Sequence, residues 1–283
     1  MTPRTLLLET ARRFREAGIP DPETDSALLL SFLTGGAPLS LRLDTDTELS
    51  PSVLEAFAVL AGRRMEREPL QYIIGEAPFR GNSFMVDPRV LIPRPETEEL
   101  CAWVLEVIPP SGADVLDLCC GSGCIGLSLA VSRPDLHVTL SDCSADALEV
   151  ARINAYRLGV QVFFHRGDLL EGFPSDSFDC IVSNPPYIPS GECPRLQPEV
   201  LSEPVLALDG GPDGLGFYRR IASDAVRILR PSGLLFLELG FGEAESVAGL
   251  LNAAGFTDIT VRRDLSGFPR MILAGSPARR NYV

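Results

Sequence analysis

From residue 113 onward, the sequence alternates apolar runs of strand length with amphipathic runs of helix length, and this alternation constrains the fold more than any other feature. The expected strands are 113–118, 136–141, 161–165, 178–183, 233–239, 257–263 and 270–274, and the expected helices are 124–132, 145–158, 214–229 and 243–255. Such alternation builds a parallel, doubly wound α/β sheet with helices on both faces. Because only a short turn separates the last two strands, we expect an antiparallel pair at one end of the sheet.

The first 70 residues are expected to form a separate helical bundle. Apolar residues recur at helical spacing within residues 3–67. Ser50 followed by Pro51 is a typical helix start, since serine caps the first amides and proline suits the first helical position. We therefore assign residues 1–70 to an N-terminal helical domain.

Residues 71–92 are expected to connect this bundle to the sheet. They contain two short β-like runs, 71–75 and 79–86, separated by turn residues, and we interpret them as a β-hairpin connector. Pro95, followed by several carboxylates, then opens another helix, because negative charge is favourable at a helix N-terminus. Residues 93–283 form the third expected domain.

Composition narrows the possible partners. The net charge is −13 and lysine is absent, so all 25 basic residues are arginine. Because proteins that grip phosphate backbones present a basic face, we expect no stable nucleic acid binding and favour a basic protein partner. Seven cysteines without a paired C-x-x-C arrangement, and only two histidines, predict reduced thiols and no metal site. Neither a membrane span nor a signal peptide is apparent, so we expect a cytoplasmic, monomeric enzyme.

A glycine-rich loop, residues 117–126, follows the first expected strand and opens a helix. Glycines let the backbone approach a ligand closely, with helix amides pointing at it. The spacing of Gly121, Gly123 and Gly126 also matches a dinucleotide fingerprint, and Asp142 at the next strand end is placed to bind ribose hydroxyls. This loop alone does not separate NAD from S-adenosylmethionine.

A second acidic position follows the third expected strand, at Asp168 and Leu169. A carboxylate there can accept a hydrogen bond from an adenine amino group. The alternative is a solvent-exposed turn aspartate.

The expected strand at 178–183 runs directly into Asn184, Pro185, Pro186 and Tyr187. Ligands of open α/β sheets bind beyond the carboxyl ends of strands, so chemistry is expected at this tetrad. The two prolines fix the chain and remove two backbone donors, which leaves carbonyl oxygens and the Asn184 side chain as acceptors without local partners. The alternative is a proline-rich turn with a buried tyrosine. It becomes less favoured because the tetrad follows a strand of the same sheet that carries the glycine loop and Asp142.

These acceptors suit a planar amino or amide nitrogen, which is a weak nucleophile because its lone pair is delocalised. The Asn184 side-chain oxygen and the Pro185 carbonyl would bind both of its hydrogens and hold its lone pair toward a methyl sulfonium. Tyr187 would offer a face to the planar group and to the positive charge that develops. A hydride-transfer site needs no such tetrad, so the combination favours S-adenosylmethionine over NAD.

The chain resembles the release factor glutamine methyltransferases of the HemK or PrmC type over essentially its whole length. The segments that carry the resemblance are 69–75, 92–98, the glycine loop, 184–187 and 201–214. The tetrad alone is shared with DNA adenine and RNA guanine methyltransferases, whereas the segment from Pro93 to Glu98 is far more specific. The resemblance implies a class I S-adenosylmethionine-dependent methyltransferase, with a Rossmann-like seven-stranded sheet, that methylates N5 of the glutamine in the Gly-Gly-Gln motif of class 1 peptide chain release factors. It also implies that the helical domain grips the release factor away from the active site.

The resemblance, taken with the motifs, gives the candidate site residues. The candidate cofactor residues are Asp117, Cys119, Cys120, Gly121, Ser122, Gly123, Asp142, Asp168, Leu169 and Asn184. The candidate substrate residues are Asn184, Pro185, Pro186 and Tyr187, with Asn184, Pro185 and Tyr187 as the catalytic ones.

Three points stay open from the sequence. Cys119 and Cys120 stand where relatives usually have glycine and a small polar residue, so the loop is expected to be restricted but still able to bind the cofactor. No role beyond capping a helix follows for Arg94 or Glu98. The alternative functions are a nucleic acid methyltransferase acting on adenine or guanine amino groups, and a cofactor-binding module that has lost catalysis.

Overall fold

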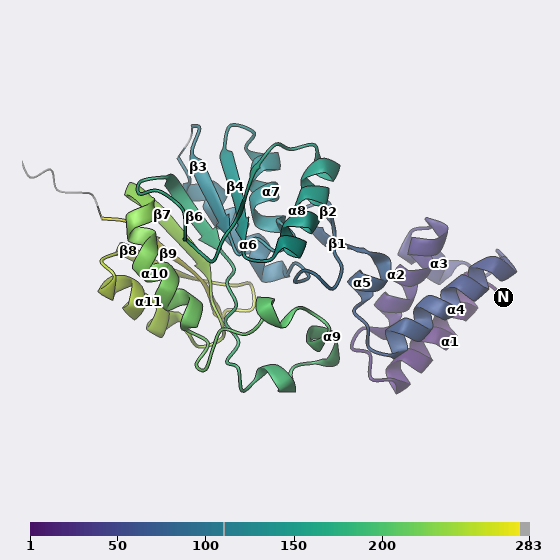
Figure 1. Cartoon of the computed structure of the whole chain (residues 1–283). Helices are drawn as coiled ribbons and strands as arrows, with labels where there is room; N and C mark the ends of the chain where they lie inside the picture. The colour runs from purple at the N-terminus through teal and green to yellow at the C-terminus, as the bar shows by residue number, and fades with distance from the viewer. Residues whose placement is uncertain (110, 278–283) are drawn as a thin grey trace, which may run out of the picture. The chain divides into compact units, whose positions relative to one another are not determined.

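The computed structural model describes residues 1–109 and 111–277 (Figure 1). These residues form two compact units. One contains residues 1–76 together with 197–202, and the other contains residues 77–196 together with the chain from 203 onward. A short segment that follows the tetrad in sequence therefore belongs to the N-terminal unit.

The N-terminal unit is the helical bundle that the sequence predicts. Its helices are α1 (Pro3–Glu16), α2 (Pro22–Thr34), α3 (Pro38–Leu43), α4 (Pro51–Met65), α5 (Leu70–Ile74) and, from the later segment, α9 (Pro198–Leu201). Ser50 caps α4 by accepting a hydrogen bond from the amide of Val53, as the Ser-Pro pair predicts. Phe14, Leu30 and Phe57 are fully buried in its core.

The prediction of β-structure at residues 71–75 is wrong, because α5 is a helix. Its Leu70 and Ile73 are buried in the core of the N-terminal unit, and Gly75 ends the helix in a left-handed conformation. Packing of these side chains outweighs the β-propensity of the Tyr-Ile-Ile run.

A buried arginine fixes α9 within the N-terminal unit. The guanidinium of Arg64, on α4, contacts Asp25 at 2.8 Å and Glu199 at 2.9 Å, and its side chain is only 4% exposed. Arg67 forms a bidentate ion pair with Glu199, with N–O distances of 2.7 and 2.6 Å. Burial alone would raise the pKa of Glu199, but the hydrogen bonds from Arg67 and Arg64 and the charge of Arg64 outweigh it and hold this pKa at about 2, below its usual range.

The second unit begins with a two-stranded sheet, β1 (Glu76–Phe79) and β2 (Asn82–Met85), followed by α6 (Pro95–Val107). Its main sheet has seven strands: β3 (Asp114–Leu118), β4 (His137–Asp142), β5 (Phe163–Arg166), β6 (Phe178–Ser183), β7 (Leu229–Glu238), β8 (Thr257–Arg263) and β9 (Pro269–Gly275). Strands β3 to β7 are parallel, whereas β9 runs antiparallel to both β7 and β8. The predicted parallel sheet with an antiparallel pair at one end is confirmed.

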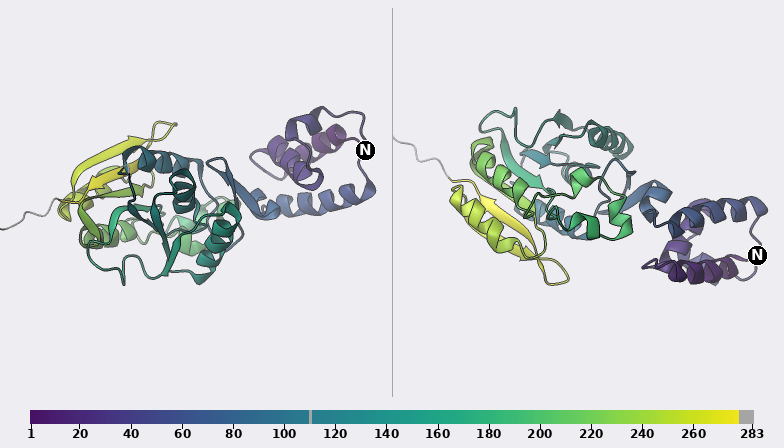
Figure 2. Two further views of the ribbon diagram at one scale, coloured as in Figure 1. Left: turned by 90° about the horizontal axis from the view of Figure 1, so that it is seen from above. Right: turned by 60° about the horizontal axis from the view of Figure 1, so that its bottom comes forward.

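Helices cover both faces of this sheet (Figures 1 and 2). On one face α6, α7 (Cys124–Ser132) and α8 (Ala145–Leu158) pack against apolar side chains of β3, β4, β6 and β7. On the other face α10 (Gly216–Ile228) and α11 (Ala244–Ala253) enclose a second apolar core. Among the described helices, none is long and apolar enough to cross a membrane.

The strand order β5-β4-β3-β6-β7-β9-β8 places the functional edge. The chain leaves β3 toward β4 on one side and later returns to β6 on the other. A crevice forms at such a reversal, beyond the carboxyl ends of the two strands. The hydroxyl of Ser183 donates to the carbonyl of Leu118 at 2.6 Å and so ties the ends of β6 and β3 together.

Gly126 lets α7 approach the sheet closely, because a Cβ atom there would lie 2.3 Å from Leu140 Cδ2 and 2.9 Å from Asp117 Cβ. We expect Gly126→Ala to destabilise the protein by about 1–3 kcal/mol through overpacking. Gly249→Ala on α11 is the matched control, since its Cβ would meet nothing within 4 Å, and alanine favours a helix by about 1 kcal/mol. Denaturant unfolding of both variants measures the effect, and equal changes in the two would contradict the packing role of Gly126.

Candidate active site

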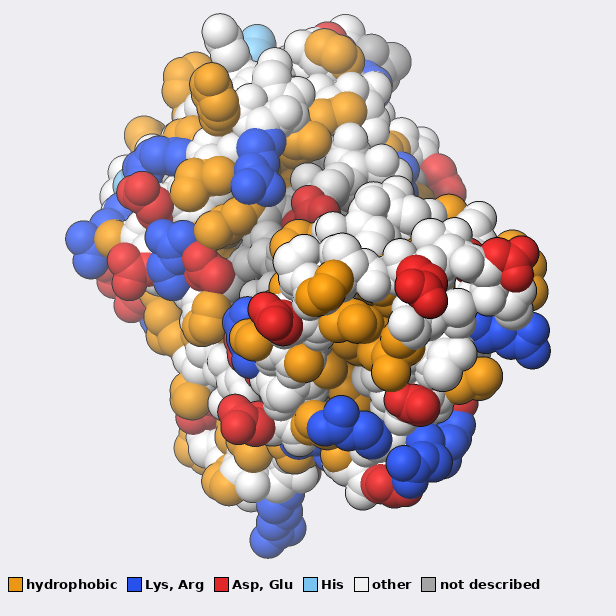
Figure 3. All heavy atoms as spheres, turned by 90° about the vertical axis from the view of Figure 1, so that its right-hand side faces the viewer, with side chains coloured by type: hydrophobic (Ala, Val, Ile, Leu, Met, Phe, Trp, Pro, Cys, Tyr) orange, Lys and Arg blue, Asp and Glu red, His pale blue; other side chains and the backbone are white. Residues whose placement is uncertain are grey.

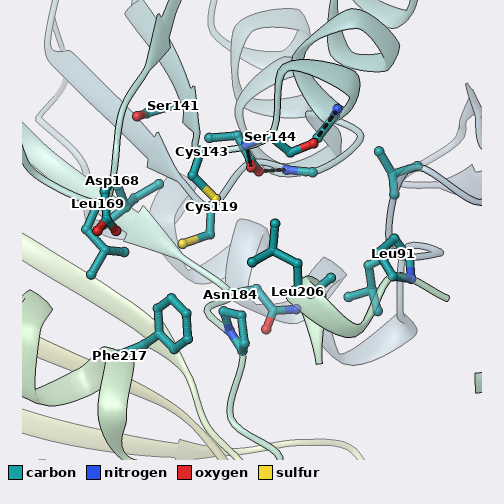
Figure 4. Close-up of a pocket in the computed structure, with 18 of the residues that line it drawn as sticks. Leu91, Cys119, Ser141, Cys143, Ser144, Asp168, Leu169, Asn184, Leu206 and Phe217 are labelled. Atoms are coloured by element: carbon teal, nitrogen blue, oxygen red, sulfur yellow. Dashed lines mark hydrogen bonds between the residues drawn. The ribbon is translucent and has the colours of Figure 1, made fainter. Parts of the chain in front are cut away.

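A cavity of about 740 Å³, including its part open to solvent, lies at the carboxyl edge of the main sheet (Figure 4). Its lining residues come from the loop after β2, the ends of β3, β4, β5 and β6, residues 204–207 and the start of α10. The cavity therefore occupies the crevice that the strand order creates.

The glycine loop forms one wall through its backbone. Cys119, Gly121 and Gly123 all have positive φ angles, of 60°, 53° and 78°. A Cβ on Gly121 would meet no atom within 4 Å, which agrees with its position facing the cavity. The amide of Cys120 is held by the carbonyl of Ser141 at 3.0 Å, so this loop is fixed to the end of β4.

Two aspartates support this loop in different ways. Asp117 is fully buried beneath it, and its Oδ2 accepts from the amide of Gly126 at 2.8 Å. Burial raises the pKa of Asp117 to about 7, and its Oδ1 has no hydrogen-bond partner among the described residues. Asp142 lines the cavity and accepts from the amides of Gly121 at 3.0 Å and Ser144 at 2.9 Å; burial raises its pKa as well.

The opposite wall is largely apolar, with one carboxylate at its rim. Leu169, Leu206 and Phe217 line the cavity, as Figure 4 shows. Asp168 lies next to Leu169 and pairs through Oδ2 with Arg220 at 2.7 Å. Its other oxygen makes no hydrogen bond recorded within the described chain, so it can accept one from a ligand.

The tetrad follows β6 at the same edge. Asn184 and Pro186 line the cavity, while Pro185 is buried and Tyr187 is half-buried behind it. The Nδ2 of Asn184 donates to the hydroxyl of Thr97, on α6, at 3.2 Å. In the described part of the chain, neither Asn184 Oδ1 nor the carbonyl of Pro185 takes part in a hydrogen bond, so both remain available as acceptors.

Glycines after the tetrad let a second loop close over it. A Cβ on Gly210 would lie 2.7 Å from Tyr187 Cα, and one on Gly214 would lie 2.5 Å from the carbonyl oxygen of Tyr187. The amide of Ile188 donates to Leu208 at 2.9 Å, and that of Gly210 donates back to Ile188 at 2.8 Å. Only glycine allows this approach, which explains the glycine-rich segment after Asp209.

Arg94 and Glu98 have structural partners beyond the start of α6. Arg94 occupies the N-cap position, but its guanidinium forms an ion pair with Glu203 instead of capping the helix. The buried carboxylate of Glu203 also accepts from the amide of Ile92 at 3.0 Å. Glu98 accepts from the amide of Arg80, between β1 and β2, at 3.0 Å. The segment that starts α6 therefore joins the two-stranded sheet to the loop after the tetrad.

All candidate residues lie at one edge of the main sheet, but only some of them line the cavity. Those that line the cavity are Cys119, Gly121, Asp142, Asp168, Leu169, Asn184 and Pro186. Those that lie beside or beneath it, outside the lining, are Asp117, Cys120, Ser122, Gly123, Pro185 and Tyr187.

Sequence reasoning missed two parts of the wall: Arg89, Val90 and Leu91 after β2, and Pro204, Leu206 and Ala207 after α9. Neither stretch carries a motif of its own. The only available signal is their position beside segments that carry the family resemblance, 92–98 and 201–214.

The residues present fit S-adenosylmethionine. The cavity offers apolar walls for an adenine ring, with the carboxylates of Asp142 and Asp168 at two strand ends for ribose and amino donors. The unpartnered Oδ1 of Asp117 beneath the loop is a further acceptor close to this wall. Within residues 1–109 and 111–277, no cluster of three or more His, Cys, Asp or Glu side chains could hold a metal ion.

Comparisons with known proteins match both parts of the chain. The family model described as "PrmC N-terminal domain" matches residues 5–75, and the model described as "Methyltransferase small domain" matches residues 100–203. A release factor glutamine methyltransferase of Geobacter sulfurreducens is 42% identical over 272 residues, covering 96% of this chain and 95% of the relative. Another, from Caulobacter vibrioides, is 41% identical and covers 92% of each chain.

Solved structures support the fold alone. A methyltransferase from Pyrococcus furiosus superposes with a TM-score of 0.54 at 19% identity, covering 70% of this chain and 90% of that one. The 16S rRNA N2 G1207 methyltransferase of T. thermophilus, solved with AdoMet and guanosine, gives 0.53 at 21% identity, covering 72% of this chain and 50% of that one.

Cys119 has a left-handed conformation that costs a side-chain-bearing residue roughly 1–2 kcal/mol. Cys119→Gly and Cys119→Ala both remove the sulfur, but only glycine relieves this strain. After the extra entropy of glycine in the unfolded chain is subtracted, we expect the glycine variant to be about 0.5–1 kcal/mol more stable than the alanine variant in denaturant unfolding. An alanine variant as stable as the glycine variant would show that the loop carries no such strain.

Proposed function

Since the chain belongs to the release factor glutamine methyltransferase family, we propose that it methylates the side-chain amide nitrogen (N5) of the glutamine in the Gly-Gly-Gln motif of class 1 peptide chain release factors. The chain is an S-adenosylmethionine-dependent methyltransferase. The observation that carries the choice of substrate group is the Asn184 side chain, whose Nδ2 is engaged by Thr97 while Oδ1 is open beside the carbonyl of Pro185.

Two open acceptors match the two hydrogens of a primary amide. S-adenosylmethionine supplies an electrophilic methyl group on a sulfonium when it is bound in the cavity. Asn184 Oδ1 and the Pro185 carbonyl each accept one hydrogen of the glutamine amide and turn its lone pair toward that methyl group. Because the amide nitrogen and the methyl group are held in the reacting geometry, the step becomes effectively unimolecular. This orientation accounts for much of the rate enhancement.

Tyr187 completes the substrate position. Its ring offers a face to the planar amide and to the positive charge that develops on nitrogen. Its hydroxyl donates to Glu238 Oε1 at 3.4 Å, and burial raises the pKa of the phenol, so Tyr187 stays neutral. No base is needed before transfer, because the amide proton leaves once the new bond has made it acidic.

A protein substrate suits the distribution of charge. The arginines near residues 12–15 and 63–67, apart from Arg13, are paired with carboxylates. The pairs are Arg12 with Glu16, Arg15 with Glu23, Arg63 with Glu68, Arg64 with Asp25 and Glu199, and Arg67 with Glu199. On the face shown in Figure 3, arginines likewise lie among acidic side chains. These pairings and the net charge of −13 favour a basic protein over free nucleic acid, so a nucleic acid N-methyltransferase is not favoured.

The domain roles complete the proposal. The N-terminal unit, residues 1–76 with 197–202, docks the release factor, residues 77–92 connect, and the rest of the chain from residue 93 carries out methyl transfer. We also propose that the protein acts as a monomer. Seven free cysteines support a cytoplasmic location, where thiols stay reduced.

Methyl-labelled S-adenosylmethionine, incubated with this protein and a purified class 1 release factor, is expected to label the Gly-Gly-Gln glutamine. Label that appears in DNA or RNA and not in the release factor would contradict the proposed substrate. A single methyl-transfer turnover is enough to exclude a binding module without catalysis.

Asn184→Ala removes one of the two amide acceptors. We expect the rate of transfer to fall by at least about 100-fold, with the dissociation constant for S-adenosylmethionine changed by less than roughly threefold. Asn252→Ala, at an exposed position on α11, is the matched control and should keep full activity. Full activity in the Asn184 variant would refute the role of this side chain.

A further inference from the structure

A chain of hydrogen bonds leads from the tetrad into the protein interior. Asn184 Nδ2 donates to Thr97 Oγ1 at 3.2 Å, and Thr97 Oγ1 donates to Glu238 Oε2 at 2.6 Å. The second oxygen of Glu238 accepts from the hydroxyl of Tyr187 at 3.4 Å. This series of hydrogen bonds thus starts at Asn184 and ends at Tyr187, both in the tetrad. It passes through Thr97 at the start of α6 and Glu238 at the end of β7.

The direction of each bond follows from the number of protons available. A hydroxyl has one proton to give. Because Thr97 gives its proton to the Glu238 carboxylate, it can only accept from Asn184. The partner on Asn184 must then be its NH₂ group, which leaves the carbonyl Oδ1 on the opposite side of the amide. An ionised Glu238 therefore decides which end of the Asn184 amide is open to the substrate.

Burial of Thr97 and Glu238 destabilises the fold, which suggests that this pair serves a function. Thr97 and Glu238 are each only 2% exposed. No salt bridge to Glu238 is found among the described residues, so its charge relies on hydrogen bonds. A buried carboxylate held by two hydroxyl groups is expensive compared with an apolar residue of similar size.

We propose that Thr97 and Glu238 are positioning residues for methyl transfer: through the bond to Thr97, Glu238 holds the Asn184 amide with Oδ1 toward the substrate nitrogen, and through Tyr187 it also fixes the ring beside it. This inference rests on the proposed function, since it specifies how the tetrad achieves its orientation. Neither residue touches the substrate or cofactor itself.

Protonation of Glu238 allows a second arrangement of these hydrogen bonds. Burial raises the pKa of Glu238 to about 7, while the bonds from Thr97 and Tyr187 lower it. A protonated Glu238 can donate to Thr97, which frees the Thr97 proton for Asn184 and favours the turned-over amide. The productive arrangement therefore exists above this pKa and is lost as the pH falls through it.

Other charged and titratable groups near Glu238 shift its pKa and so set the pH at which the hydrogen bonds rearrange. The titratable and charged side chains that face it are Glu96 and Cys101 on α6, Cys124 on α7, Tyr187 after β6, Tyr218 on α10 and Arg270 on β9. Glu96 raises the pKa of Glu238 and Arg270 lowers it. The pKa values of the cysteines and tyrosines are themselves raised by burial, so they stay neutral at the pH where Glu238 titrates.

The first test replaces the hydroxyl. Thr97→Val keeps the shape but leaves Asn184 Nδ2 and Glu238 without their partner. We expect kcat for release factor methylation to fall roughly 10- to 100-fold, with little change in the dissociation constant for S-adenosylmethionine. Thr97→Ser, which restores the hydroxyl, should recover most of the rate. Thr139→Val, at a partly buried position on β4, is the matched control and should leave kcat unchanged.

The second test addresses the charge. Glu238→Gln keeps an acceptor for Thr97 but cannot ionise. The wild-type rate is expected to rise with pH through about 7. The glutamine variant is expected to rise less over the same range, because only the contribution of Glu238 is lost while Asp117 still titrates there. Tyr187→Phe removes a bond that stabilises the carboxylate, so it should move the wild-type midpoint to higher pH. A purely structural role would change the melting temperature without altering these profiles.

The third test asks whether the two residues act along one path. If they do, the double variant Thr97→Val with Glu238→Gln is no slower than Thr97→Val alone, whereas independent roles would multiply the losses. The inference is overturned if Thr97→Val keeps wild-type kcat, or if Glu238→Gln keeps the wild-type pH profile. Failure of the proposed function is distinguishable, because the wild-type protein itself would then fail to label the release factor.

Discussion

A side-chain amide presents an acceptor at one end and a donor at the other, and the chemistry of this site depends on which end Asn184 shows to the cavity. The bond from its Nδ2 to Thr97 fixes that choice. With the amide held in this way, Asn184 Oδ1 and the carbonyl of Pro185, both beyond the carboxyl end of β6, make no hydrogen bond within the described residues. In the mechanism we propose, these two acceptors select a planar nitrogen with two hydrogens, and this selection requires a rigid site.

The rigidity comes from close backbone approaches that only glycine permits. Gly126 brings α7 against the strand that precedes the cofactor loop, and Gly210 and Gly214 bring a second loop against the backbone of Tyr187. The buried carboxylate of Glu203 then joins this second loop to the start of α6, which also carries Thr97. The segment that starts α6 is thus a structural support for the tetrad, which gives a physical reason for its specificity to this family.

The sequence predicts most of the fold, because strands and helices of the sheet are encoded by local apolar spacing. It fails at α5, where tertiary burial of Leu70 and Ile73 decides between helix and strand. It also predicts the tetrad and the carboxylates at the strand ends, since their position follows from topology. It cannot predict the partnership of Thr97 with Glu238, which are separated by 141 residues and meet only in the folded protein. The walls formed by Val90 and Leu206 were missed for the same reason.

The central claim is that this site methylates one glutamine side chain on a protein. Mass spectrometry of a class 1 release factor, with and without incubation with this protein and S-adenosylmethionine, tests it most directly. We expect one added methyl group, located on the side chain of the Gly-Gly-Gln glutamine and absent when Asn184 is alanine. An unmodified release factor, or a methyl group on another residue, would contradict it.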